Sequence, residues 1–336
     1  MGKKMIFAFA FVSIIVSIIY SYGLRDNNPT KDTFSDVDKQ VVLPKEEGGG
    51  AVDESPIDKN IILQKEKDLD LILKTIEDRK TDDLILVNKW NLLSESYKPS
   101  PILDGAGDIP STKKEMLLQE NALRAAIKLF DGINSEGITG LRAVSGYRPF
   151  SYQSQLYNAK VNYFANDFDL ETAKEKASEI VAVPGTSEHQ TGLVIDFSCL
   201  ELLKTSDPLV EEFKNSPEGK WLYENAWKYG FTLRYLPEKK DITGIISEPW
   251  HFRYVGIPHA EYMNNNNLSL EEYIEYLKKI EQITFEDYHG NKYQINYVQK
   301  EEYGILLGDE FDIEKVIAVS GSTKDEYIIT QKLELE

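Results

Sequence analysis

Two short stretches of sequence place histidines beside carboxylates, and they constrain this chain more than any other feature. The first holds His189 and Asp196, and the second holds Glu248 and His251. Two imidazoles and one carboxylate can occupy three corners of a zinc tetrahedron and leave the fourth for water. Glu248 then remains as a base for that water, so the pattern indicates a zinc hydrolase.

The spacing of these residues makes demands on the backbone. Seven positions separate the histidine and the aspartate of the first stretch, so a reversal around Gly192 must bring both to one metal. In the second stretch, Pro249 pushes Glu248 toward extended or polyproline geometry. Positions i and i+3 of polyproline II project to the same side. We therefore expect a local kink that aims Glu248 and His251 at one site.

The residues around both stretches resemble a known family, the zinc D-Ala-D-Ala carboxypeptidases of the VanY type. The matching positions are Ser187-x-His189-x-x-Gly192-x-Val194-x-Asp196, then Glu248-x-Trp250-His251-x-Arg253, with Ser145-Gly146-Tyr147-Arg148 and Leu86-Val87-Asn88-Lys89 upstream. The resemblance covers about residues 83–280. Val194 stands where the family usually has alanine, and we expect the metal ligands to be unaffected by this difference.

The resemblance implies a Hedgehog/DD-peptidase-like zinc peptidase fold with defined roles for its residues. His189, Asp196 and His251 would bind Zn²⁺. Glu248 would take a proton from metal-bound water and return it to the leaving amine. Arg148 would stabilise the oxyanion, or its planar fork would hold the terminal carboxylate of the substrate.

The resemblance also suggests which residues contact the substrate. Ser187 and Gln155 would hydrogen-bond the substrate backbone or carboxylate. Tyr147 and Trp250 would form walls of the pocket. Arg253 is expected to orient its strand rather than to touch the substrate.

The implied activity is removal of the terminal D-Ala from peptidoglycan stem peptides by a serine-independent metallopeptidase. A cell-wall endopeptidase or a D-Ala-D-Ala dipeptidase with the same zinc site stays open, because the loops that close the pocket are not positioned by the sequence. A non-enzymatic, wall-binding protein is the third alternative. That alternative predicts loss of Glu248 or of a metal ligand, and the sequence retains all of them.

Composition narrows the partners and the compartment. The net charge of −18 argues against a nucleic-acid partner, since such proteins need a basic footprint. We expect a monomer. The chain has one cysteine, Cys199, so it forms no intramolecular disulfide; we expect a buried, apolar role for this residue rather than a fourth metal ligand.

The N-terminus predicts an extracytoplasmic location. Lys3 and Lys4 precede an uncharged apolar run that continues to about Leu24, and about 20 such residues span a bilayer. The positive flank predicts that the N-terminus stays inside and the remainder is exported. We expect residues 1–24 to be a membrane anchor, with cleavage as a signal segment, and hence secretion, as the alternative.

Four regions are predicted along the chain. Residues 1–24 are the anchor or signal segment, residues 25–60 a flexible linker, residues 61–280 the zinc peptidase domain with its core from about 83, and residues 281–336 a small β-rich extension. Residues 61–81 suggest an amphipathic helix that either packs on the domain or forms a stalk. The extension either packs on the catalytic domain or binds the wall or a partner.

Helices and strands are expected to alternate irregularly, which predicts an α+β class. Helices are expected at 113–130, 151–164, 171–181, 221–229 and 268–280, and strands at 84–87, 141–144, 192–197, 231–235 and 250–255. A β-hairpin at 284–298 and strands at 316–319 and 327–330 are expected in the extension.

Overall fold

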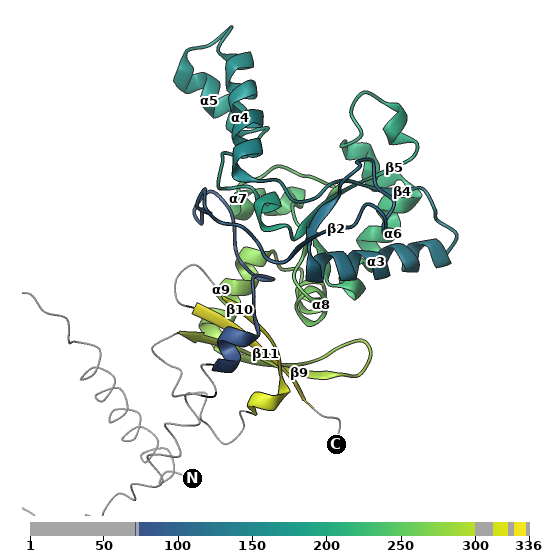
Figure 1. The fold of residues 1–336 in the computed structure, drawn as a ribbon, viewed down its shortest axis with the longest axis vertical. Helices are drawn as coiled ribbons and strands as arrows, with labels where there is room; N and C mark the ends of the chain where they lie inside the picture. Colours follow the sequence, from purple (N-terminus) through teal and green to yellow (C-terminus); the bar gives the residue numbers. More distant parts are fainter. Residues whose placement is uncertain (1–70, 72–73, 300–311, 322–325, 334–336) are drawn as a thin grey trace, which may run out of the picture. The chain divides into compact units, whose positions relative to one another are not determined.

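The computed structural model describes residues 71, 74–299, 312–321 and 326–333 (Figure 1). The predicted anchor and linker, residues 1–60, lie outside this part of the chain, and the leading helix is described only at residues 71 and 74–78. Within the described residues, no helix combines the length and the apolar character needed to cross a membrane. From residue 78 onward, the described residues belong to one compact unit.

A four-stranded antiparallel sheet forms the centre of the peptidase elements. Its order is β4 (Leu141–Ser145), β5 (Val194–Cys199), β7 (His251–Tyr254) and β6 (Phe231–Leu233). All six residues of β5 are buried, because the strand lies between two neighbours and both of its faces are covered. The apolar and β-branched composition of β5 suits this position.

Helix α3 (Glu120–Ser135) packs on this sheet through an apolar stripe, and the rings of Phe130 and Phe197 meet edge to face at 5.9 Å. The expected helix from residue 113 was wrong in its first turns. Strand β3 (Leu117–Gln119) instead pairs with β2 (Ile102–Asp104). The Gln119 side chain then accepts a hydrogen bond from the Asn121 N–H and caps the helix, because the first N–H groups of a helix need partners outside it.

Helices α4 (Phe150–Phe164) and α5 (Leu170–Ser178) form a pair that extends away from the other peptidase elements in Figure 1. They contact each other through Val161, Ala173 and Ala177. Further α-helices in the described part of the chain are α6 (Pro217–Asn225), α7 (Lys240–Thr243), α8 (Ile257–Asn265) and α9 (Leu270–Ile280). Ser269 and Glu272 form a capping box that starts α9, which satisfies two of the N–H groups that would otherwise lack partners.

The segment at residues 84–87 is not the strand that its apolar composition suggested. Its residues are mostly buried but pair with no neighbouring strand. The Arg253 guanidinium instead donates to the carbonyl oxygens of Asp83 at 3.0 Å and Ile85 at 2.9 Å. This side chain therefore satisfies two buried carbonyl groups that have no partner in a β-ladder.

The C-terminal region forms a second, five-stranded sheet. Its order is β1 (Lys80–Thr81), β10 (Val316–Gly321), β11 (Glu326–Leu333), β9 (Lys292–Gln299) and β8 (Gln282–Glu286). The predicted hairpin and both later strands are confirmed. Ile283, Ile295 and Ile328 share one apolar cluster with residues of α8 and α9. Helices and largely antiparallel strands in separate groups confirm the α+β class.

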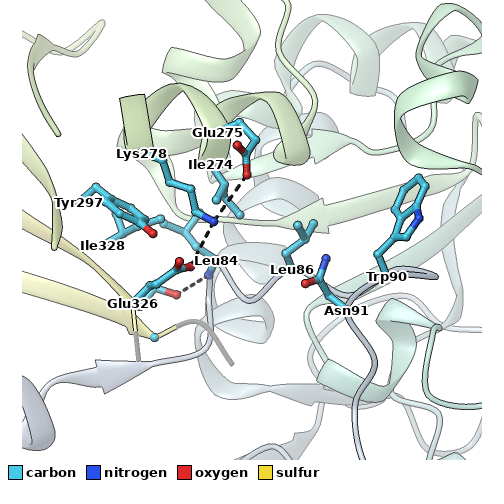
Figure 2. A pocket seen from close by; sticks show the side chains of 12 residues that line it. Leu84, Leu86, Trp90, Asn91, Ile274, Glu275, Lys278, Tyr297, Glu326 and Ile328 are labelled. Carbon is cyan, nitrogen blue, oxygen red and sulfur yellow. Dashed lines mark hydrogen bonds and ion pairs between the residues drawn. The ribbon is translucent and has the colours of Figure 1, made fainter. Parts of the chain in front are cut away.

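A pocket lies where the C-terminal sheet meets the peptidase elements (Figure 2). Its lining includes Leu84, Leu86 and Trp90, then Ile274 and Lys278 of α9, and Tyr297, Glu326 and Ile328 of the sheet. Lys278 joins α9 to the sheet through an ion pair with Glu326 at 3.3 Å, and it also pairs with Glu275 of its own helix at 3.6 Å. The pocket is separate from the histidines of the two sequence motifs, neither of which is among its described lining residues.

Candidate active site

The backbone between His189 and Asp196 reverses direction, which brings the two side chains together. His189 lies on a short 3-10 helix, Glu188–Thr191, which ends at Gly192 in the left-handed region at φ 70°. A Cβ at Gly192 would lie 2.7 Å from Cδ1 of Ile102, so both the backbone angle and the space favour glycine. The chain then enters β5, where Asp196 pairs directly with His251 of β7.

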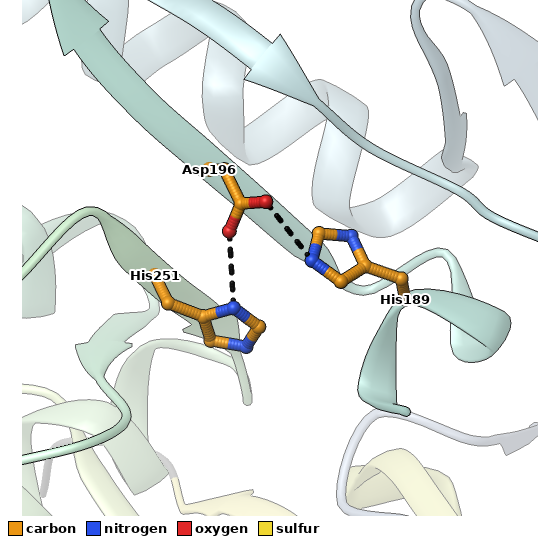
Figure 3. Close-up of side chains that lie close together, drawn as sticks. All are labelled: His189, Asp196 and His251. Carbon is orange, nitrogen blue, oxygen red and sulfur yellow. Dashed lines mark hydrogen bonds and ion pairs between the residues drawn. The ribbon is translucent and has the colours of Figure 1, made fainter. Parts of the chain in front are cut away.

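Figure 3 shows Asp196 between the two histidines, as the spacing predicted. Nε2 of His189 lies 3.1 Å from Oδ2 of Asp196, and Nδ1 of His251 lies 3.0 Å from Oδ1. One nitrogen or oxygen from each residue falls within 4.8 Å of the others. All three side chains are buried.

The orientation of His189 is set by a backbone carbonyl. Its Nδ1 lies 2.7 Å from the Gly146 carbonyl oxygen, so Nδ1–H donates and Nε2 keeps its lone pair toward Asp196. A Cβ at Gly146 would lie 2.5 Å from the Leu117 carbonyl oxygen. The glycine of the Ser-Gly-Tyr-Arg motif therefore lets two backbones approach closely beside the site.

Charge at the three residues suits a divalent cation. Burial, reinforced by Arg148, lowers the pKa of His189. Burial raises the pKa of Asp196, but the two histidines outweigh it and the pKa falls well below its usual range. Burial also lowers the pKa of His251, yet Asp196 and Glu188 outweigh it and raise that pKa to about 9. The carboxylates therefore hold a proton on His251, which a metal would displace.

The donor set fits Zn²⁺. Two imidazole nitrogens and one carboxylate oxygen are the ligands of many catalytic zinc sites, in which the fourth position stays open. The ring nitrogens that face Asp196 are the ones available to a metal, since Nδ1 of His189 is already committed to Gly146. Cys199 is buried within the main apolar cluster, which confirms its expected apolar role.

Glu248 lies at the edge of this cluster. The expected kink is a turn, closed by a 3.0 Å hydrogen bond from the His251 N–H to the Glu248 carbonyl. The carboxylate Oε2 of Glu248 lies 3.5 Å from Nδ1 of His251, and its side chain is 24% exposed. Burial raises the pKa of Glu248 to about 7; His251 opposes this rise and Asp196 reinforces it. The carboxyl group can therefore both accept and release a proton near neutral pH.

Arg148 reaches the site from the turn after β4. Its Nη2 lies 3.8 Å from Oδ2 of Asp196, and its Nη1 donates to Oε1 of Gln153 at 2.8 Å. Gln153 is buried and its Nε2 donates to the Ala182 carbonyl at 2.7 Å. Sequence reasoning missed Gln153. Gln153 lies five residues after Arg148, near the start of a predicted helix, and this position was the only indication in the sequence that it could contact Arg148.

The other residues expected to contact the substrate differ in their burial. Gln155 is exposed on α4 and has no described hydrogen bond to Arg148. Ser187 is buried just before the 3-10 helix of His189. Tyr147 is half-buried beside Arg148. Trp250 lies in the turn before β7 and packs against the main core.

Comparisons with known proteins agree with this geometry. The family model described as VanY, D-alanyl-D-alanine carboxypeptidase, matches residues 115–257. A D-alanyl-D-alanine carboxypeptidase of Enterococcus faecium is 34% identical over 235 residues, which cover 67% of this chain and 68% of that protein. The chain belongs to the VanY-type family of zinc D-Ala-D-Ala carboxypeptidases. The VanY-type resemblance seen in the sequence is thus confirmed.

Two solved structures show the same fold as this VanY-type chain. The LdcB LD-carboxypeptidase is 39% identical with a TM-score of 0.50, covering 56% of this chain and 84% of that one. The D,D-dipeptidase VanXYg, solved with a D-Ala-D-Ala phosphinate analogue, is 26% identical with a TM-score of 0.57, covering 75% and 94%. These likenesses confirm the predicted Hedgehog/DD-peptidase-like fold. As a VanY-type metallopeptidase the chain is an enzyme whose cofactor is zinc.

Proposed function

We propose that this chain is a D-alanyl-D-alanine carboxypeptidase that removes the terminal D-Ala from peptidoglycan stem peptides, with Glu248 as its general base. The observation that carries the proposal is the position of Glu248. Its carboxylate is partly exposed, lies 3.5 Å from a ligand nitrogen of His251 and has a pKa of about 7. A base beside the metal ligands and open to solvent meets the requirements of peptide hydrolysis.

Different residues bind the metal, transfer the proton and stabilise negative charge in the proposed reaction. Zn²⁺ held by His189, Asp196 and His251 would supply Lewis acidity at the scissile carbonyl. Glu248 takes the proton of the attacking water and then returns it to the leaving amine. Arg148 lies 3.8 Å from Asp196, and its guanidinium stabilises the oxyanion or holds the terminal carboxylate of the substrate.

The proposal includes the location and the partners of the enzyme. A substrate in the peptidoglycan lies outside the membrane, and the apolar run after Lys3 and Lys4 supports export with the N-terminus inside. We propose an anchor at residues 1–24, a linker at 25–60, a peptidase domain at 61–280 and a β-rich extension at 281–336, working as a monomer.

A second candidate is an L,D-carboxypeptidase, which removes D-Ala from an L-configured centre. The 39% identity to the LdcB LD-carboxypeptidase favours this alternative. The dipeptidase alternative draws support from the likeness to VanXYg. An inactive, wall-binding protein is disfavoured, because the three ligands and Glu248 are all present and gathered.

One experiment separates these candidates. The purified, zinc-loaded protein is incubated with stem peptides ending in D-Ala-D-Ala, with stem peptides ending in a single D-Ala, with free D-Ala-D-Ala and with cross-linked dimers, and products are identified by mass spectrometry. Loss of one alanine from the first substrate alone supports the proposal. Cleavage confined to the second, third or fourth substrate would instead establish the L,D-carboxypeptidase, the dipeptidase or the endopeptidase.

A further inference from the structure

A chain of buried charges runs beneath His251. The Glu188 carboxylate oxygen Oε1 accepts from Nε of Arg234 at 2.9 Å and from Nη1 of Arg253 at 2.9 Å. Arg234 in turn donates two hydrogen bonds to Glu271 of α9, at 2.7 and 2.8 Å. The side chains of Glu188, Arg234 and Arg253 are at most 1% exposed. Such burial is costly unless every charge has partners.

One oxygen of this network faces the metal site. Oε2 of Glu188 lies 3.5 Å from Nε2 of His251. Both atoms are buried, and neither has a hydrogen-bond partner among the described residues. Buried polar atoms of this kind are rarely left without partners. The pair is therefore aligned for an N–H donated by His251 to Glu188, with a small adjustment in distance.

We propose that Glu188 is a positioning residue that holds His251 as the Nε2–H tautomer, so that Nδ1 presents its lone pair to the metal. Arg234 and Arg253 keep the Glu188 carboxylate ionised and fixed. His189 is held in the opposite tautomer, with Nδ1–H on Gly146 and Nε2 toward Asp196. The two histidines thus bind through different ring nitrogens, each selected by the acceptor behind it. The role rests on the zinc site of the proposed function.

Glu188→Gln tests the role, because it keeps the shape of the side chain but replaces one acceptor oxygen with a donor NH₂ group. Arg234 and Arg253 both donate to the Oε1 position, so the amide oxygen of the glutamine should occupy it. The amide nitrogen then takes the position of Oε2 and presents its N–H groups to Nε2 of His251. That arrangement opposes the Nε2–H tautomer. Metal affinity should fall about 10–100-fold, the usual effect of losing a partner behind a ligand, as measured by competition with a chromophoric zinc chelator.

Glu271→Gln is the matched control. Glu271 belongs to the same network through Arg234 but has no described contact with His251. Both variants should lower the thermal stability of the metal-free protein, since each weakens the partners of a buried arginine. Only Glu188→Gln should lower zinc affinity. Equal zinc affinities in the two variants would overturn the positioning role.

Nitrogen-15 NMR of the histidine rings supplies a readout that stability alone does not move. In the zinc-loaded wild type, His251 should show a protonated Nε2, and this signal should shift or vanish in Glu188→Gln. Should that variant not fold, Glu188→Asp is the substitute. The shorter side chain keeps a negative charge for the arginines but no longer reaches Nε2 of His251, so the same loss of zinc affinity is expected. Wild-type affinity and an unchanged Nε2 signal would overturn the proposal, whereas a wild type without stoichiometric zinc would overturn the zinc site itself.

Discussion

His259 Nε2 lies 3.1 Å from the Thr330 hydroxyl oxygen, which joins α8 of the peptidase elements to β11 of the C-terminal sheet. On its other side, Nδ1 of His259 lies 2.8 Å from the Tyr273 hydroxyl. Burial lowers the pKa of His259 to about 3. This histidine is therefore neutral in the folded protein, and its two ring nitrogens link α8 to α9 and to β11.

The burial of His259 predicts an acid-sensitive junction. An unfolded histidine has a pKa of about 6.5, so the unfolded state binds the proton more tightly and stability is lost as the pH falls from there toward 3. At pH 5 the loss should be about 2 kcal/mol relative to neutral pH. Denaturant unfolding should show this loss in wild type and in a variant of the exposed His289, but not in His259→Gln. An equal loss in His259→Gln would contradict the prediction.

Replacing Glu248 with alanine should abolish turnover and leave zinc in place. The metal ligands are unchanged, while the group that moves the proton is gone, and such groups contribute about 10²–10⁴-fold. Metal analysis and initial rates on a D-Ala-D-Ala peptide test both parts. Glu238→Ala, at an exposed position, serves as the control. Retention of more than about a tenth of the activity would exclude Glu248 as the base.

Arg148→Lys should be costly although the charge is kept. A point charge replaces a two-pronged donor, and loss of one stabilising group of this kind costs about 10²–10³-fold in rate. The fall should appear mainly in kcat if Arg148 serves the oxyanion, and mainly in KM if it holds the substrate carboxylate. Peptides with free and amidated C-termini distinguish the two roles.

The control for this test is Arg124→Lys, on the exposed face of α3, where the side chain is 70% exposed. It should behave like wild type on both peptides. If Arg148→Lys were also indistinguishable from wild type on both, Arg148 would have no part in the site.

Gln153→Leu and Gln155→Leu should have different consequences. Gln153 fixes the Arg148 fork through a 2.8 Å hydrogen bond, and a hydrogen bond to a charged group is worth about 1.5–3 kcal/mol. We expect kcat/KM to fall about 10–100-fold in Gln153→Leu and to stay near wild type in Gln155→Leu. Circular dichroism and bound zinc serve as checks that both variants fold. The reverse ranking would support the prediction that Gln155 contacts the substrate.

The metal site was predictable because its information is local. His189 and Asp196 lie on either side of a required glycine, and Glu248 and His251 share one turn, so four residues at fixed spacings specified the geometry. Gln153 was missed for the opposite reason. Its role depends on how the first turn of α4 lies against Arg148 and Ala182, and two glutamines two positions apart look alike in a sequence.

Long-range contacts explain the remaining differences. The apolar residues at 84–87 suggested a strand, and only the approach of Arg253 from a distant strand shows why their carbonyls need no ladder. Strand β1 likewise exists because Lys80 and Thr81 meet Val319 and Ser320. A two-residue strand has no periodicity of its own, so no local pattern could indicate it.

The buried arginines have a consequence for where this enzyme can be divided. Arg234 finds its second partner in Glu271 of α9, and Arg253 finds carbonyl partners in Asp83 and Ile85. All three partners lie outside residues 115–257, the stretch that carries the family signature. A fragment trimmed to that stretch would contain every metal ligand and yet bury two cations without their full complement of acceptors. The catalytic motif is thus shorter than the autonomous folding unit, which needs chain from both of its flanks.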